Sequence, residues 1–298
     1  MQDPPLGVPL RQVVDALERL YPPDTAQSWD QVGVVTGDLD QPIHRVLVAV
    51  DPTSAVIDEA QDTGADLIIT HHPLLLRGIH SVAPSTAKGS AIHTLLLGDI
   101  ALYCAHTNAD VAPFGVGVAL ATAAGLSDTE PLTIAEGHEL GRVGDLVEPT
   151  SLRDFAQALG RALPPTASGM RIAGPPEASV RRVAVLGGAG DGEFAAVLAS
   201  GADVYVTADL RHHPASEARE QAALTGGTPY LIDAGHYASE ATWRPLLAEQ
   251  LRLGLGAAAD RLDIDISTVC TDPWEFVVGT GPEATATSPN VRDTRERE

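Results

Sequence analysis

An internal repeat of two short aliphatic strands constrains the fold of this chain more than any other feature of its sequence. Residues 45–50 and 64–70 form the first copy, and residues 182–186 and 201–207 form the second. The opening Arg and the Gly that starts the second strand are 19 residues apart in both copies (64 − 45 and 201 − 182). Short aliphatic runs separated by helical stretches are typical of parallel sheets with crossover helices. The repeat therefore predicts two related α/β lobes with mixed sheets.

Two adjacent histidines, His71 and His72, end the second strand of the first copy. Adjacent strand residues point to opposite faces, so these two side chains can serve two different atoms. The carboxyl ends of parallel strands are also where α/β proteins place their ligands. On its own, a histidine at the end of a strand is more often a core or capping residue.

Each copy continues to a third short strand that ends in a histidine, and a carboxylate follows four residues later. These pairs are His106 with Asp110 and His236 with Glu240. At the start of a helix, residues four apart lie on one face, so His236 and Glu240 can reach a common centre. The repetition predicts that strand ends from both lobes form one shared metal cleft.

The predicted metal ligands combine imidazole and carboxylate donors, which suit Zn, Fe, Mn or Co. They are His71, His72, Asp110, His236 and Glu240. Three histidines and two acids exceed the needs of one closed zinc site. They fit two divalent ions bridged by a carboxylate, with open positions for water.

Three further histidines are candidates for catalysis. His106 is assigned either to the active site, as a hydrogen-bond partner of a ligand or a proton donor, or to a structural role. His212 and His213 imitate His71 and His72, so the repeat places them near the cleft as acid/base or substrate contacts. The alternative for this second pair is an ordinary surface position.

The hydrophobic periodicity and the capping residues predict the remaining elements. Helices are expected at 10–20, 53–64, 86–98, 115–125, 151–163, 215–224 and 239–253, and a hairpin at 132–147. A boundary near residues 127–131 gives an N-terminal lobe at 1–127 and a C-terminal lobe at 128–280. Residues 281–298 are polar and lack periodicity, which predicts a disordered tail.

The net charge of −21 limits the possible partners. Such a surface repels nucleic-acid backbones and anionic membranes, so neither is expected as a partner. The N-terminus lacks the pattern of a signal peptide, no apolar stretch is long enough to span a membrane, and two cysteines form no disulfide framework. A cytoplasmic location is expected.

Four ordered motifs resemble the Nif-three-like dinuclear metal-centre family over roughly residues 8–280. They are Ser-Trp-Asp-x-Val-Gly at 28–33, Thr-His-His-Pro-Leu at 70–74, Ala-His-Thr-Asn-x-Asp at 105–110 and Asp-Ala-Gly-His-Tyr-x-Ser-Glu at 233–240. The resemblance implies two α/β lobes, a toroidal homohexamer and the five metal ligands named above. At 207–214 this chain has Ala208 where the family has Gly, so either His212 or His213 is the matching histidine.

The resemblance also implies a function, because some members of that family are described as a second type of GTP cyclohydrolase I. The expected activity is metal-dependent hydrolysis of a purine nucleotide such as GTP, opened at its imidazole ring. The alternative is a non-catalytic metal-binding scaffold or protein-interaction module. A catalytic site needs open coordination positions and substrate contacts, whereas a scaffold does not.

Self-association is the first testable expectation. If the chain assembles as the resemblance implies, light scattering will give a mass near that of six chains. A monomer at micromolar concentration contradicts this expectation.

Overall fold

The computed structural model describes residues 7–280 and 286–287. It contains two compact units, each built from separate stretches of chain. Among the described residues, unit 1 comprises 7–120, 131–142 and 240–271, and unit 2 comprises 121–130, 143–239, 272–280 and 286–287. The lobes expected from the sequence are continuous stretches, whereas here the chain returns to unit 1 after residue 239. Apart from 286–287, the tail expected to be disordered lies outside the described residues.

Unit 1 contains a five-stranded mixed sheet in the order β13-β4-β5-β6-β2. Its strands are β2 (Gly33–Thr36), β4 (Arg45–Ala49), β5 (Leu67–Thr70), β6 (Ala101–Cys104) and β13 (Asp263–Ile266). Four strands are parallel, and β2 runs antiparallel to β6. A two-residue pair, β1 (Val8–Pro9) with β3 (Pro42–Ile43), lies at the start of this unit.

Most of the expected helices form close to their predicted bounds, whereas the four-residue helix Thr107–Asp110 was not expected. The helices are α1 (Leu10–Leu20), α2 (Ser54–Thr63), α3 (Ala87–Leu97), α4 (Thr107–Asp110), α5 (Val116–Ala123), α6 (Leu152–Ala162), α7 (Phe194–Ser200), α8 (His212–Leu224), α9 (His236–Ala241) and α10 (Trp243–Leu255), with 3-10 turns η1 (Pro23–Thr25) and η2 (Gly256–Arg261). Hydroxyl caps define several starts, because the side chains of Thr53, Thr86 and Ser151 accept backbone N–H bonds from the first turns of α2, α3 and α6.

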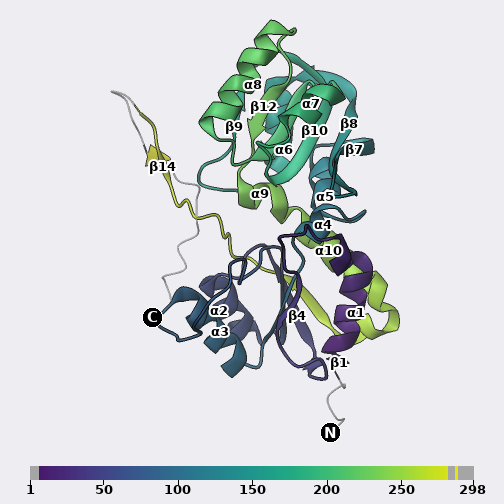
Figure 1. Ribbon diagram of the computed structural model, residues 1–298, viewed down its shortest axis with the longest axis vertical. Helices are drawn as coiled ribbons and strands as arrows, with labels where there is room; N and C mark the ends of the chain where they lie inside the picture. Colours follow the sequence, from purple (N-terminus) through teal and green to yellow (C-terminus); the bar gives the residue numbers. More distant parts are fainter. Residues whose placement is uncertain (1–6, 281–285, 288–298) are drawn as a thin grey trace. The chain divides into compact units, whose positions relative to one another are not determined.

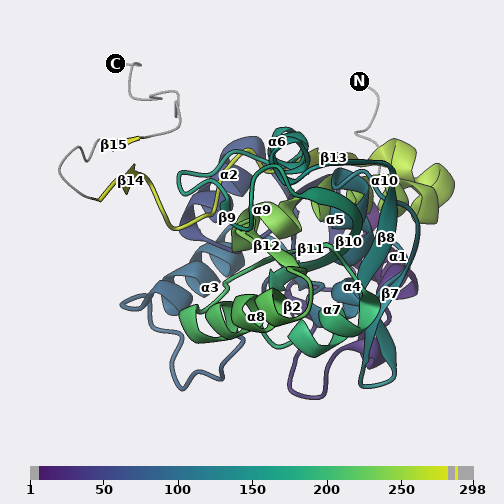
Figure 2. The same ribbon diagram turned by 90° about the horizontal axis from the view of Figure 1, so that it is seen from above.

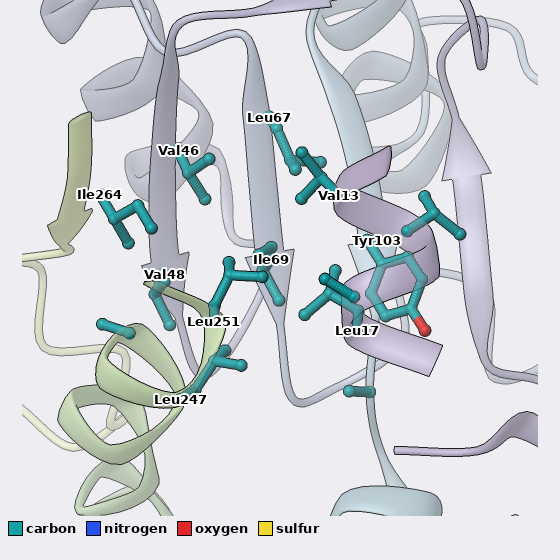
Figure 3. Packing of buried hydrophobic residues seen from close by; sticks show 14 of the residues in the cluster. Val13, Leu17, Val46, Val48, Leu67, Ile69, Tyr103, Leu247, Leu251 and Ile264 are labelled. Carbon is teal, nitrogen blue, oxygen red and sulfur yellow. The ribbon is translucent and has the colours of Figure 1, made fainter. Parts of the chain in front are cut away.

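The core of unit 1 lies on both faces of its sheet. On one face, Leu251 of α10 packs with Val48 and Ile69, and α1 covers the same face (Figure 3). On the other face, Leu47 and Ile68 pack under α2 and α3. The strands are buried on both sides, which explains their nearly uninterrupted aliphatic sequences.

Unit 2 contains a six-stranded mixed sheet in the order β7-β8-β10-β11-β12-β9. Its strands are β7 (Ser127–Ala135), β8 (His138–Ser151), β9 (Arg171–Ala173), β10 (Ser179–Ala189), β11 (Val204–Ala208) and β12 (Tyr230–Asp233). Strands β10, β11 and β12 are parallel, and α6 lies on one face with α7 and α8 on the other (Figure 2). A separate two-residue pair joins β14 (Val277–Val278) to β15 (Ala286–Thr287).

Matching aspartates, one in each unit, show that the sequence repeat is also a structural repeat. The backbone of both units is drawn in Figure 1. In unit 1, Oδ2 of Asp66 accepts hydrogen bonds from the backbone N–H groups of His44 (2.6 Å) and Arg45 (2.9 Å). In unit 2, Oδ2 of Asp203 accepts two equivalent bonds from consecutive N–H groups, at 2.8 and 2.9 Å. Each carboxylate lies just before the second strand of its copy and accepts hydrogen bonds from the start of the first strand. The prediction of two related α/β lobes is therefore confirmed.

The helix expected at 239–253 was wrong in its bounds, because the chain forms two helices that meet at Thr242. Pro245 explains the break: its nitrogen carries no hydrogen for the carbonyl oxygen four residues earlier, which belongs to Ala241. That oxygen instead accepts a hydrogen bond from Nε of Arg244 at 3.2 Å. The short helix α9 is therefore a separate element at the point where the chain passes from unit 2 to unit 1.

Replacement of Leu251 by Ala tests whether the returning segment belongs to the core of unit 1. Leu251 is fully buried, so we expect Leu251→Ala to lower the free energy of unfolding by about 2 to 5 kcal/mol. The matched control is Leu253→Ala on the same helix, where the side chain is 68% exposed and the expected change is below about 0.5 kcal/mol. Equal losses for the two variants in urea denaturation would contradict the packing.

Candidate metal centre

The end of β5 holds His71 and His72 in fixed positions. The backbone N–H of His72 donates to the carbonyl oxygen of Val50 at 2.8 Å, and the Thr70 hydroxyl donates to the carbonyl oxygen of His72 at 2.8 Å. His71 is 1% exposed, whereas His72 is only partly buried. The strand therefore presents one histidine inside unit 1 and the other at its edge.

Glu240 lies between the two imidazoles and offers one carboxylate oxygen to each. Its Oε1 is 3.5 Å from Nε2 of His71, and its Oε2 is 3.1 Å from Nε2 of His72. Asp110 completes the group, with Oδ1 3.6 Å from Nε2 of His71. All four residues belong to unit 1. Carboxylate oxygens and imidazole nitrogens brought together in this way are compatible with divalent metal binding.

The opposite ring nitrogens are held by oxygen acceptors. Nδ1 of His71 is 3.0 Å from the carbonyl oxygen of Ala105, and Nδ1 of His72 is 2.7 Å from Oδ1 of Asp51. A carbonyl oxygen only accepts hydrogen bonds, so Nδ1 of His71 must carry the hydrogen. In the neutral ring, the Nε2 lone pair then faces Glu240. Metal-binding histidines are oriented in this way in proteins.

The proton distribution also shows a centre that needs positive charge. Burial lowers the pKa of His72, but its hydrogen bonds to Asp51 and Glu240 raise it to about 10. Burial likewise opposes the charge of His71, and the nearby Glu240 and Asp110 carboxylates raise its pKa overall. Burial raises the pKa of Asp110. Divalent cations supply the same compensation for the buried carboxylates, so these residues fit a metal centre.

His236, the fifth predicted ligand, is the first residue of α9, one helical turn before Glu240. Its Nδ1 is 2.8 Å from Oδ2 of Asp209, which repeats the anchoring of His72 by an aspartate. The division between the units falls inside α9, after Ser239. Residues four apart on a helix share a face, so α9 carries the side chains of His236 and Glu240 on the same face. The shared cleft and the complete set of five ligands stay predictions.

His106 joins the two strand-end histidines. One ring nitrogen from each of His71, His72 and His106 lies within 4.8 Å of the other two. Nδ1 of His106 is 3.0 Å from Oδ2 of Asp30, which also accepts hydrogen bonds from the backbone N–H and the hydroxyl of Thr107. Burial raises the pKa of Asp30, but these hydrogen bonds hold it well below its usual range. Asp30 is therefore an ionised anchor for the His106 ring.

Sequence reasoning missed the three aspartates that hold these rings, Asp30, Asp51 and Asp209. Two of them follow strands: Asp51 comes just after β4, and Asp209 directly follows β11. The repeat offset of 137 residues (203 − 66) carries His72 onto Asp209, because 72 + 137 = 209. The repeat therefore placed Asp209 at the strand end that corresponds to His72, and this correspondence was the sequence signal that could have identified it. For Asp30, which precedes β2, the sequence offered only its place in a loop motif.

His212 and His213 open α8 in unit 2, and both are exposed. Their rings are 5.2 Å apart, centroid to centroid. They follow β11 by several residues, so they do not occupy the strand-end positions that His71 and His72 occupy in the first copy. Their participation in catalysis stays a prediction.

Comparison with known proteins identifies the family. The model of the Duf34/NIF3 (NGG1p interacting factor 3) family matches residues 8–273. This chain belongs to the Duf34/NIF3 family. It is 48% identical over 286 residues to a Streptomyces coelicolor protein named "GTP cyclohydrolase 1 type 2 homolog", covering 93% of this chain and 97% of that protein. A Mycobacterium tuberculosis protein with the same name is 35% identical over 385 residues, covering 93% and 99%.

Solved structures share the fold of this chain. A Bacillus cereus protein related to NIF3 has a TM-score of 0.82 and 26% identity, covering 91% of this chain and 100% of that chain. Reduced HcgD from Methanocaldococcus jannaschii has a TM-score of 0.72 and 29% identity, covering 88% and 98%. Within the described part of the chain, no helix is long and apolar enough to cross a membrane.

Metal content tests the division of the two histidines between two centres. Elemental analysis of the metal-loaded protein is expected to give about two ions per chain. His71→Ala and His72→Ala are each expected to lose about one ion, because the two rings face different oxygens of Glu240. His93→Ala, a change in α3, is the control and is expected to keep both ions. Full occupancy in both strand-end variants would refute the assignment.

Proposed function

We propose that this Duf34/NIF3 protein is a dinuclear metal-dependent hydrolase that acts on a purine nucleotide such as GTP. The observation that carries the proposal is the position of Glu240, which offers one oxygen to His71 and the other to His72. Together with the anchored Nδ1 atoms, this arrangement supports two ions bridged by one carboxylate. The residues that would hold them are His71, His72, Asp110, His236 and Glu240.

Two divalent ions, when bound, lower the pKa of a water molecule and polarise a substrate oxygen. The protein's own side chains must then deliver a proton to the nitrogen that is released when the C–N bond breaks. We assign this task to His106, whose ring lies 5.3 Å from that of His71 and 5.6 Å from that of His72, centroid to centroid. Nδ1 of His106 lies 3.0 Å from Oδ2 of Asp30, so we assign proton exchange with the substrate to Nε2.

The choice of a purine nucleotide is supported by the names of the relatives. The 48% identical Streptomyces coelicolor protein and the 35% identical mycobacterial protein share the name "GTP cyclohydrolase 1 type 2 homolog". Opening the imidazole ring of a purine needs water attack at carbon and protonation of the departing nitrogen. The proposed centre and His106 offer these two functions in adjacent positions.

The proposed assembly is a homohexamer in the cytoplasm.

Hydrolysis of a nucleotide panel that includes GTP, by metal-reconstituted protein, tests this proposal. Glu240→Gln is expected to abolish turnover, because it removes the bridging charge with little change of shape. His106→Ala is expected to lower turnover by about 10²-fold to 10⁴-fold while the metal stays bound, as for loss of a general acid. Glu249→Gln, an exposed carboxylate on α10, is the control and is expected to turn over normally.

A comparison of Asp30→Asn with His106→Ala tests whether Asp30 affects turnover by positioning His106 or by a separate effect on the fold. If Asp30 acts through His106, the double variant will be no slower than His106→Ala alone. Additive losses would remove Asp30 from the mechanism. If no nucleotide turns over while metal remains bound and a protein partner is captured, the scaffold interpretation replaces the hydrolase.

A further inference from the structure

A pocket of about 780 Å³ lies in unit 1 beside the metal centre. His72 and Asp51 contribute to its wall, and the rest comes from the segments after β4 and β5 and the first turns of α2 and α3. Its volume falls within the range of about 300 to 1,000 Å³ that is typical of small-molecule sites. The pocket therefore joins a predicted metal ligand to a space large enough for a substrate.

Lys88 is the chemically distinctive residue of this pocket. It is the only lysine in a chain of net charge −21. It lines the pocket from the first turn of α3 and is partly buried. Among residues 7–280, no ion pair or hydrogen bond engages its ammonium group. An unengaged ammonium in a strongly acidic protein is a binding group for an anion, and lysine binds phosphate as a point charge.

The acidic groups of the pocket do not neutralise Lys88. Asp51 is engaged by Nδ1 of His72 and by the hydroxyl of Thr271. Asp58, the other carboxylate in the wall, is exposed to solvent. Lys88 therefore remains available to a ligand.

Uncharged donors surround Lys88 on the same wall. The backbone N–H groups of Ala87 and Lys88 lie in the first turn of α3, where no carbonyl of the helix can accept them. Thr86 already accepts the N–H of Gly89, at 3.1 Å, so the remaining first-turn donors are left for another acceptor. The hydroxyl of Ser90 lines the pocket as well. Several N–H and O–H donors around one ammonium suit the oxygens of a phosphate group.

Another part of the pocket wall is apolar. Pro52, Ile57, Pro73 and Leu74 line the pocket, and Ile57 and Leu74 belong to the buried core under α2 and α3. Apolar side chains of this kind can contact the faces of a planar ring, whereas they provide no hydrogen-bond donor or positive charge for a phosphate. The pocket thus offers one cationic group and an apolar part of its wall, and His72 also lines it.

We propose that this pocket binds a phosphate-bearing small molecule, with its phosphate groups on Lys88 and the first turn of α3 and its remaining part beside His72. The identification of that molecule as a nucleotide rests on the proposed function, whereas the phosphate site rests on the pocket itself. Lys88 is thereby assigned a role in substrate binding, not in the chemical step.

Covalent labelling tests the location directly, because the chain has a single lysine. GTP oxidised to its 2′,3′-dialdehyde forms an imine with a nearby amine, and cyanoborohydride reduces the imine to a stable amine. We expect peptide mass spectrometry to find the label on Lys88. Inorganic tripolyphosphate is expected to protect Lys88 from the label, while guanosine protects it weakly. Labelling of the N-terminal amine alone, or protection by guanosine but not by tripolyphosphate, would overturn the proposal.

Charge variants give a second, quantitative test on metal-loaded protein. Lys88→Gln is expected to weaken tripolyphosphate binding and raise KM for any nucleotide substrate by about tenfold to a hundredfold, as for loss of a charged hydrogen bond, with kcat nearly unchanged. Lys88→Arg keeps the charge and is expected to restore most of the affinity. Arg11→Gln, which removes an exposed cation paired with Asp40, is the control and is expected to leave binding unchanged.

The outcomes separate this inference from the proposed function. Turnover with an unchanged KM in Lys88→Gln overturns the phosphate site and leaves the hydrolase standing. Tripolyphosphate binding that depends on Lys88, in a protein that turns over no nucleotide, supports the phosphate site while the hydrolase fails. Thermal unfolding of each variant checks that the fold is retained, and Lys88→Arg gives the answer if Lys88→Gln is unstable.

Discussion

The buried carboxylate of Glu240 is the interaction on which the rest of the candidate centre depends. It is 3% exposed and lies between two imidazoles that are themselves fixed by acceptors on their far sides. Removing one partner from a buried charged pair typically costs about 3 to 5 kcal/mol, because the other charge is left uncompensated. The centre is therefore built as a unit in which protons or metal ions must balance the acids.

The fold places that carboxylate by routing the chain back to its first unit. Residues 240–271 supply Glu240, helix α10 and the edge strand β13, which pairs in parallel with β4. Trp243, fully buried on α10, donates a hydrogen bond from Nε1 to the hydroxyl of Tyr21 at 3.1 Å. The hydroxyl of Tyr21 lies 3.1 Å from the carbonyl oxygen of Phe114. The segment that carries Glu240 is thus fixed on the same sheet whose strand ends carry His71 and His72.

Much of this was predictable from the sequence because it depends on local patterns. The Arg-to-Gly spacing revealed the two related α/β lobes, and Ser151 marked the start of α6 through its capping hydroxyl. The His-x-x-x-acid pairs drew attention to Asp110 and Glu240. The anchoring aspartates were harder, because Asp30 acts on His106 across 76 residues (106 − 30) and only tertiary structure brings them together. The position of β13 beside β4 is likewise a long-range pairing that carries no local signal.

The scarcity of lysine links the charge of the chain to its proposed specificity. An acidic surface repels free nucleotides, so binding must depend on a few local cations in the pocket. Arginines in unit 1 such as Arg11 and Arg45 are engaged by aspartates at the surface, whereas the ammonium of Lys88 faces the pocket beside His72. Metal ions at the centre would add positive charge next to the same space. A phosphate-bearing ligand would then bind at this one part of an otherwise acidic surface. The positions of Lys88 and of the metal ions would determine its orientation.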